Sequence, residues 1–400
     1  MFNYLNPPRA EREQIIAAAV DVFKQRFYEP SLSGFDIDAS LEGQRTALLE
    51  TPDFPSAMKS FFELCKARPI DFFYFPERTV PLGRLLKTTF FEAESGEVFF
   101  RDVLIGGRAE EAGILSGFRL TGINGGDPRK EQLRVSAVKP FDISIQGIDG
   151  RAKTLKFDAP ATWRPRKEKN LAFKDLGNGL GYVRIASWPG ILGMDVARET
   201  DAAIKSMRAK KLIVDLRGNT GSAGAGNVRI MSYLTPERIP VGYSLTRRRA
   251  QDGYDRNDLP RLERIPRFKF AVPFVLWKFR KVDKSIVVVT EGLKKQAFHG
   301  NVMMLVNQHT ISGAEIVTHF AKELGLARIV GERTAGLSLA HATLPLPFDY
   351  RLTLPIGDYV PWHGERFEDV GVQPEVCVPY AVDQHPAADS QLEETIRLAR

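Results

Sequence analysis

The clearest hydrophobic pattern in the chain lies in residues 302–336, where apolar runs alternate with polar turns. Residues 302–306 form an apolar run of the length that predicts a buried strand, and a short polar turn follows it. From Ser312 onward, apolar residues recur every four positions, which predicts an amphipathic helix that ends at Gly325. A second apolar run at 327–330 predicts the next strand. Strand, helix and strand in this order indicate an α/β unit.

A similar alternation begins near residue 179 and predicts that residues 161–400 form an α/β domain. The runs GYVRI and KLIVDL are typical of strands, and residues 195–208 between them have the spacing of a helix. The second strand leads directly into RGNTGSAGAG, a loop dense in glycine. Such a loop can bind phosphate, but this one lacks the Gly-Lys-Ser/Thr ending, so a nucleotide site is not expected. The insert at 240–295, rich in basic and aromatic residues, matches no motif, and we expect it to fold over the site or pack at its edge.

The first 160 residues show two other patterns. Residues 1–79 contain two amphipathic stretches, at 15–26 and 56–67, and predict a helical region. Residues 80–160 contain short strands separated by glycine turns, and the runs FDISIQ and AKTLKF predict a hairpin. The chain is therefore divided into a helical region, a β-rich domain and an α/β domain.

Composition narrows the classes of protein that the chain can be. Of its 400 residues, 43% are hydrophobic and 26% are charged, which is typical of a globular protein. No apolar run reaches the roughly 20 residues of a membrane span, and the N-terminus has no apolar signal core. We therefore expect a soluble protein, cytoplasmic as given, or of the cell envelope or secreted if the chain was trimmed.

Charge and cysteine content point to no cofactor. The net charge is +7, but the basic residues are scattered along the chain, so no nucleic-acid partner is expected. The two cysteines have no metal-ligand spacing, and neither a metal nor another cofactor is predicted. Nothing in the sequence indicates the oligomeric state.

Ser312 occupies the junction between the polar turn and the predicted helix. The first amides of a helix have no intrahelical partner and carry the positive end of the dipole, so they can stabilise an oxyanion close to a serine hydroxyl. Serine is also a common N-cap, a role that requires no catalysis. The hydrophobic pattern leaves both roles open.

Three sequence motifs resemble those of the carboxy-terminal processing (tail-specific) serine peptidases, a family with tricorn-like and retinoid-binding-protein-like branches. TISGAEI followed by GLARIVGERTAG resembles the active-site segment, DLRGNTGS resembles the element Asp-Leu-Arg-x-Asn-x-Gly-Gly, and FEDVGVQPEV resembles the closing element. The resemblance implies an α/β peptidase core of the crotonase/ClpP-like type with a helical N-terminal region. It also implies a serine endopeptidase that acts on peptides or protein C-termini.

The resemblance assigns roles to individual residues. Ser312 becomes the nucleophile, and its own amide together with that of Thr220 or Gly221 becomes the pair of oxyanion donors. Glu368 takes the position at which the tricorn-like branch has a functional glutamate.

The string VLIGGRAEEAGILSGFRLTGINGGDP resembles the middle of a PDZ domain, which implies that residues 80–160 form a PDZ-like β domain. The preceding loop of Leu82, Gly83 and Arg84 would then hold a peptide carboxylate, while the peptide adds to an edge strand. On this interpretation the partners are peptides or proteins recognised at the C-terminus. An ordinary Pro-Gly turn is the alternative for this loop.

The sequence departs from the family pattern at the general base. The positions of the family lysine and glutamine hold Leu337 and His341, and no lysine follows as far as Arg400. If residues 337–343 form one strand, His341 shares a face with Leu337, and its ordinary pKa suits a base near neutrality. We therefore predict His341 as the base, and His309 is a weaker candidate. A non-catalytic role of His341 at the surface or in the core stays open. A catalytically inactive family member that binds peptides or apolar ligands is the alternative function.

Overall fold

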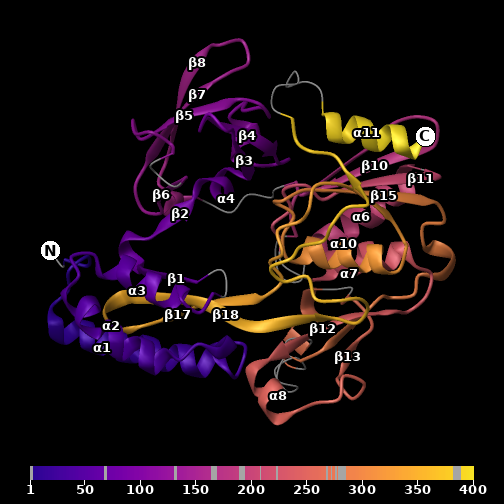
Figure 1. Cartoon of the computed structure of the whole chain (residues 1–400). Coiled ribbons are helices and arrows are strands. Elements are labelled where there is room, and N and C mark those ends of the chain that lie inside the picture. Colours follow the sequence, from indigo (N-terminus) through magenta and orange to yellow (C-terminus); the bar gives the residue numbers. More distant parts are fainter. Residues whose placement is uncertain are drawn as a thin grey trace.

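The structure of the protein is a computed structural model, which describes residues 3–66, 70–129, 133–163, 169–188, 194–207, 209–221, 224–266, 269–271, 273–274, 277, 285–381 and 389–400. Figure 1 shows helices at the N-terminal end, a β-rich unit, and a larger α/β part in which the chain ends. Within the described ranges, no helix is both long and apolar enough to cross a membrane.

A six-stranded sheet is the centre of the C-terminal part (Figure 1). In spatial order its strands are β19 (Val376–Cys377), β16 (Arg328–Gly331), β15 (Asn301–Val306), β11 (Lys211–Asp215), β10 (Leu180–Ile185) and β9 (Leu171–Asp175). Neighbouring strands pair in parallel, except that β9 runs antiparallel to β10. Parallel strands covered on both faces are apolar along their whole length, which explains the continuous runs in the sequence.

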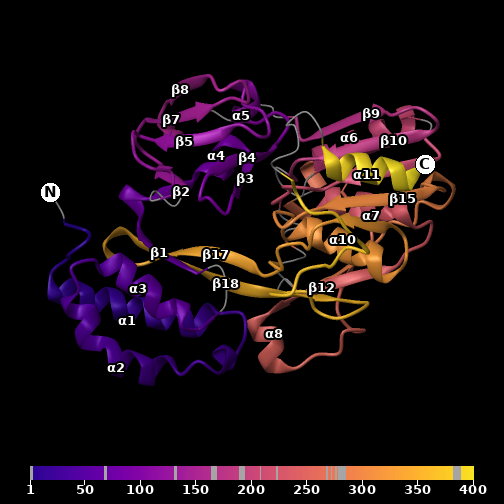
Figure 2. The ribbon, with the colours of Figure 1, turned by 45° about the horizontal axis from the view of Figure 1, so that its top comes forward.

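Helices cover both faces of this sheet, as Figure 2 shows. On one face lie α6 (Met194–Met207), α7 (Ala225–Leu234) and α10 (Gly313–Glu323), and on the other lies α11 (Ser390–Ala399). Side chains alternate along β11, so Leu212 and Val214 pack among the first set of helices while Ile213 packs towards α11. The glycine-rich loop and the loop before α10 both follow the carboxyl ends of strands that pair directly, β11 and β15.

The long strand β18 (Tyr350–Pro361) organises a second sheet. It pairs with β17 (Ala340–Pro345), β1 (Asp71–Tyr74) and β12 (Pro240–Thr246), and the sheet continues through β14 (Val287–Val289) to β13 (Arg261–Leu262). β12, β13 and β14, together with α8 (Arg247–Asp252), belong to the insert that matched no motif. The described part of the insert therefore contributes strands to this sheet.

The predicted helical N-terminal region is confirmed and consists of α1 (Arg9–Arg26), α2 (Ile37–Glu50) and α3 (Phe54–Glu63). Its aromatic core, which includes Phe23 and Phe62, also contains Tyr350 and Leu352 of β18. Since β1 pairs with the same strand, residues 1–79 share a core and a sheet with the C-terminal hairpin β17–β18. The sequence did not predict α2.

The unit predicted at 80–160 has a hydrophobic core of its own around Phe100, Ile114 and Ile143. It contains β2 (Thr79–Pro81), α4 (Leu82–Leu86), β3 (Thr88–Glu92), β4 (Val98–Val103), α5 (Arg108–Glu111), β5 (Arg119–Ile123), β6 (Arg134–Ser136), β7 (Phe141–Gln146) and β8 (Ala152–Phe157). Five strands form one sheet in the order β3-β4-β5-β7-β8, and β7–β8 is the predicted hairpin. Its identity as a PDZ-like domain stays a prediction.

Candidate active site

Ser312 immediately precedes α10 and has an unusual backbone conformation, with φ 57° and ψ −117°. A positive φ is rare for a residue with a side chain and costs energy, and such strain concentrates at functional sites. A serine on a strained turn between a strand and a helix is also how the nucleophile is presented in other hydrolase folds. Ser312 is partly exposed, while most of the helix behind it is buried.

The buried carboxylate of Glu315 holds this turn in place. Its side chain is fully buried and accepts hydrogen bonds from the amide of Ser312 at 3.0 Å, the hydroxyl of Thr334 at 2.6 Å, and the amides of Gly336 and Leu337 at 2.6 and 2.9 Å. Burial raises the pKa of Glu315, and the donors act in the opposite direction. This carboxyl therefore joins the predicted nucleophile to the loop that holds the family's lysine position.

The glycine-rich loop lies directly against the predicted nucleophile. The carbonyl of Asn219 accepts from the amide of Ile311 at 2.9 Å, so the loop is bonded to the residue before Ser312. The side chain of Asn219 donates to the carbonyl of Ile185 at 2.9 Å and accepts from the amide of Gly221 at 3.0 Å. A Cβ atom on Gly221 would lie 2.3 Å from the ring of Trp188, so glycine allows the loop to pack there.

The backbone amides around Ser312 differ in whether they already donate a hydrogen bond within the protein. The amides of Ser312 and Gly221 donate to Glu315 and Asn219. The sequence had assigned the amide of Ser312 to the oxyanion, with Thr220 or Gly221 as the second donor. The amides of Thr220 and Gly313 have no hydrogen-bond partner among the described residues. Gly313 is the first residue of α10, whose amide has no intrahelical acceptor. Sequence reasoning missed Gly313, although the predicted start of the helix contained the signal.

Glu368 contacts the loop after Leu337. One of its carboxylate oxygens accepts from the amide of Ser338 and, at 2.8 Å, from the hydroxyl of the same residue. Burial raises the pKa of Glu368, and the charges of Asp369 and Glu315 add to the effect. The described contacts of Glu368 therefore hold the backbone beside the predicted site.

The two candidate histidines occupy different surroundings. His341 lies on β17 opposite Pro355, half buried, but the strand begins only at Ala340 and its register shifts between Ala340 and His341. The expectation that residues 337–343 form one strand is wrong, and the role of His341 stays a prediction. His309 lies in the loop before Ser312, and its Nε2 donates to the carbonyl of Phe90 on β3 at 3.1 Å. Burial lowers the pKa of His309.

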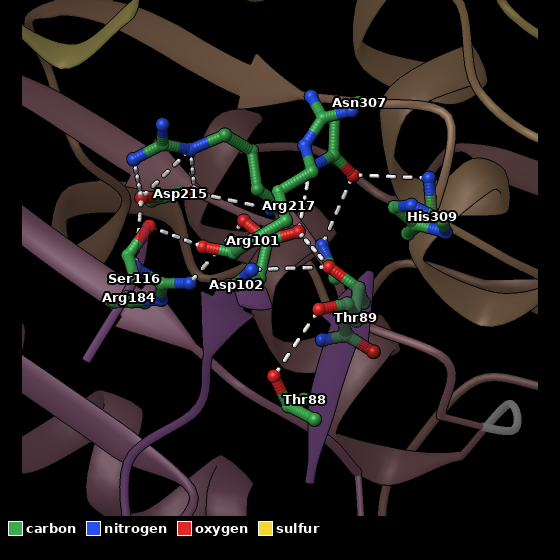
Figure 3. Close-up of polar contacts among 12 residues, drawn as sticks. Thr88, Thr89, Arg101, Asp102, Ser116, Arg184, Asp215, Arg217, Asn307 and His309 are labelled. Carbon is green, nitrogen blue, oxygen red and sulfur yellow. Dashed lines mark hydrogen bonds and ion pairs between the residues drawn. The ribbon is translucent and has the colours of Figure 1, made fainter. Parts of the chain in front are cut away.

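A buried network of charges includes Asp215 and Arg217, where β11 leads into the glycine-rich loop (Figure 3). Asp215, fully buried at the end of β11, accepts from Arg217 at 2.8 Å and from the hydroxyl of Tyr182 at 2.8 Å. Arg184 pairs with Asp215 at 3.9 Å and with Asp102 of β4 at 3.7 Å. Burial alone would raise the pKa of Asp215, but Arg217 and Arg184 outweigh it and hold the pKa at about 2.

The β-rich unit reaches this network through Asp102 (Figure 3). Asp102 accepts from the side-chain amide of Asn307 at 2.8 Å, and the oxygen of that amide accepts from the backbone of Gly218 at 3.1 Å and of His309 at 3.0 Å. Gly218 has φ 70°, and a Cβ there would lie 3.0 Å from that of Asp102. Asp102 and Asn307 thus join the β-rich unit to both loops of the site.

A sequence model of peptidase family S41 matches residues 179–378, which is half of the chain. The chain belongs to peptidase family S41. This membership confirms the family predicted from the motifs. The matched range contains the glycine-rich loop, Ser312, Glu315, His341 and Glu368.

Individual relatives agree with this assignment. A carboxyl-terminal-processing protease of Picosynechococcus sp. is 23% identical over 289 residues, which are 69% of this chain and 59% of that protein. The match therefore spans less than two thirds of the relative's length.

Solved structures show the same fold. The photosystem II D1 C-terminal processing protease superposes with a TM-score of 0.55 at 16% identity, covering 98% of this chain and 97% of its own. Mature CPAF, in a complex with lactacystin, superposes with a TM-score of 0.60 at 14% identity, covering 98% of both chains. These likenesses confirm the predicted α/β fold with its helical N-terminal region.

The S41 chain places the predicted peptide-binding residues in an unexpected element. Leu82, Gly83 and Arg84 form the first turn of α4, whereas the sequence predicted a loop. Leu82 is fully buried and its amide donates to the carbonyl of Leu133 at 2.7 Å, so this amide is not available to a carboxylate. No group of three or more His, Cys, Asp or Glu side chains in the described part of the chain is placed to hold a metal ion.

Proposed function

We propose that this S41 protein is a serine peptidase in which Ser312 attacks the carbonyl of a peptide bond. The observation that carries the proposal is the strained turn at Ser312, fixed by Glu315 and flanked by unpaired amides of Gly313 and Thr220. Backbone N–H groups that point at a developing oxyanion are commonly the largest catalytic contribution in acyl transfer. The glycine-rich loop supplies one such group and the start of α10 supplies the other.

The proposed reaction has two halves. The Ser312 hydroxyl adds to the peptide carbonyl and passes its proton to the base, and the amides of Gly313 and Thr220 stabilise the oxyanion. The C–N bond then breaks, the leaving amine takes the proton from the base, and an acyl-serine forms. Water, deprotonated by the same base, hydrolyses the ester and releases the acid product and Ser312.

His341 is the base in this proposal. Two observations support this role. His341 follows Leu337 by four residues in the sequence, and it lies half buried on β17, next to the loop that is bonded to Glu315 and Glu368. Glu368 acts by positioning Ser338 and its neighbours. General base catalysis typically contributes about a hundredfold or more, so loss of the imidazole has a measurable effect.

Peptides or proteins recognised at the C-terminus are the proposed substrates. The support is the edge position of β3, which follows α4 and, among the described strands, pairs only with β4. An extended peptide can add to such an edge, and the amides of Gly83 and Arg84 would receive its carboxylate. The carbonyl of Phe90 already accepts from His309, so a peptide that pairs with Phe90 must replace this bond.

Labelling by a fluorophosphonate probe tests the nucleophile. Wild-type protein is expected to take up the probe, and Ser312→Ala is expected to remain unlabelled. His341→Ala should lower the labelling rate by about a hundredfold, whereas replacing His299, an exposed histidine, should leave it unchanged. Absence of labelling and of peptide cleavage in the wild type would favour the alternative of an inactive binding module.

C-terminal recognition needs a separate measurement. A fluorescent peptide with a free carboxylate should bind more tightly than the same peptide with a C-terminal amide. Arg84→Ala leaves the backbone amide in place, so it should weaken binding much less than Gly83→Pro, which removes an amide. Equal binding of the two peptides would contradict this part of the proposal.

A further inference from the structure

An ion pair joins the C-terminal helix to the base of the predicted oxyanion loop. Arg217, the residue before Gly218, is buried at the base of the loop. Its guanidinium donates to both carboxylate oxygens of Asp389, at 2.7 and 2.6 Å, and to the side chain of Gln391 at 3.2 Å. A fork of two parallel hydrogen bonds fixes the plane of the guanidinium as well as its distance.

Asp389 is itself held in place. It is the N-cap of α11, where one oxygen also accepts from the amide of Leu392 at 3.0 Å. Gln391 donates to the carbonyl of Val378 at 2.7 Å, and α11 packs on the face of the sheet that includes Ile213 and Leu305. The carboxylate of Asp389 therefore has a position set by the sheet, although its side chain is 40% exposed.

Arg217 is held from two sides. Its Nε and one terminal nitrogen donate to Asp215 at 3.1 and 2.8 Å, and both terminal nitrogens donate to Asp389. Asp215 is shared, since it also pairs with Arg184 and accepts from Tyr182. Without Asp389, the buried guanidinium would share the Asp215 carboxylate with Arg184, and the terminal nitrogen that does not reach Asp215 would keep only Gln391 among its described partners.

We propose that Asp389 is a positioning residue for catalysis: by holding Arg217, the C-terminal helix sets the geometry of the oxyanion loop from Gly218 to Gly221. This inference rests on the proposed peptidase function. Asp389 is not one of the proposed oxyanion donors, so its effect passes through the backbone that joins Arg217 to Thr220. A misplaced donor affects the transition state more than the bound substrate, so the effect falls on kcat.

Asp389→Asn tests the proposal because asparagine keeps the shape and the N-cap but removes the charge. The matched control is Glu394→Gln, which removes a carboxylate of the same helix whose one ion-pair partner among the described residues is Arg397, at 2.6 Å. We expect Asp389→Asn to lower kcat for a peptide substrate by about tenfold or more with KM nearly unchanged. Glu394→Gln is expected to keep both constants, and a kcat for Asp389→Asn equal to that of this control would overturn the proposal.

Hydrogen–deuterium exchange gives a reading that does not depend on activity. We expect the peptide that spans residues 211–221 to exchange faster in Asp389→Asn than in Glu394→Gln, with the exchange of α10 unchanged. If the wild type neither labels nor cleaves but this difference appears, Asp389 holds the loop and the proposed function fails. If the exchange of residues 211–221 is the same in both variants, Asp389 does not hold the loop, whatever the activity.

Discussion

The backbone amides of Ser312 and Leu337 donate to the same oxygen of Glu315, at 3.0 and 2.9 Å. A residue at the start of α10 and a residue 25 positions later in the chain are thus held beside each other by one buried carboxyl. The family's lysine position therefore lies next to the proposed nucleophile, even though leucine occupies it. In the proposed site, the backbone frame is retained and the base is a different residue.

Glu315→Gln should damage both stability and activity. A glutamine side chain has one acceptor oxygen, so the four donors that now reach the carboxylate cannot all be satisfied. An unsatisfied buried donor costs about 1–3 kcal/mol, and denaturant titration should show a loss of at least this size. Labelling of Ser312 should fall as well. Glu323→Gln, at the exposed end of the same helix, is the control and should behave as wild type.

Leu337→Lys should create a second base beside Ser312. A lysine there places an amine next to the hydroxyl, and its deprotonated form can accept the proton. In a His341→Ala background, we expect Leu337→Lys to recover probe labelling, with a rate that rises towards alkaline pH. Leu337→Met is of similar length and has no amine, so it should recover nothing. Equal rates for the lysine and methionine variants would show that this position does not face the hydroxyl.

Local patterns predicted the frame of the site well. Ser312 was placed at the start of a helix because apolar residues recur with helical spacing after it, and α10 begins at Gly313. The helix start depends on residues that are close in sequence, where periodicity and helix-end rules apply. The resemblance to the family, and no local pattern, placed the glycine-rich loop beside Ser312, and the strands that precede the two loops, β11 and β15, pair in parallel.

The parts that failed depend on tertiary contacts. The strand phase at His341 is broken by a register shift after Ala340, which no local pattern indicates. The amide of Leu82 is bonded to Leu133, across the β-rich unit. Arg217 meets Asp389 from 172 positions away. Such partners are chosen by the packing of the sheets, so neither propensity nor spacing could have predicted them.

Asn307→Asp should weaken the contact between the β-rich unit and the loops of the site. The side chain of Asn307 now donates to Asp102 at 2.8 Å, and an aspartate there would set two carboxylates against each other in a buried place. Protonation of one of them relieves the repulsion, so the loss in melting temperature should be larger at pH 7 than at pH 5. Asn178→Asp, in an exposed turn, should show no such difference. A loss that does not change with pH would contradict the expected repulsion.

Asp215 should make the folded state sensitive to strong acid. Burial would raise its pKa, but Arg217 and Arg184 outweigh burial and lower it from 3.8 to about 2. Because the folded pKa is below the unfolded one, the stabilisation is complete above about pH 4 and is lost as the pH falls through 2. A shift of this size corresponds to roughly 2 kcal/mol.

The free energy of unfolding of wild type should therefore approach that of Asp215→Asn between pH 5 and pH 2. Asp258→Asn, which removes an exposed carboxylate, is the surface control. A gap between wild type and Asp215→Asn that stays constant as the pH falls would mean that Asp215 is not held ionised by the two arginines.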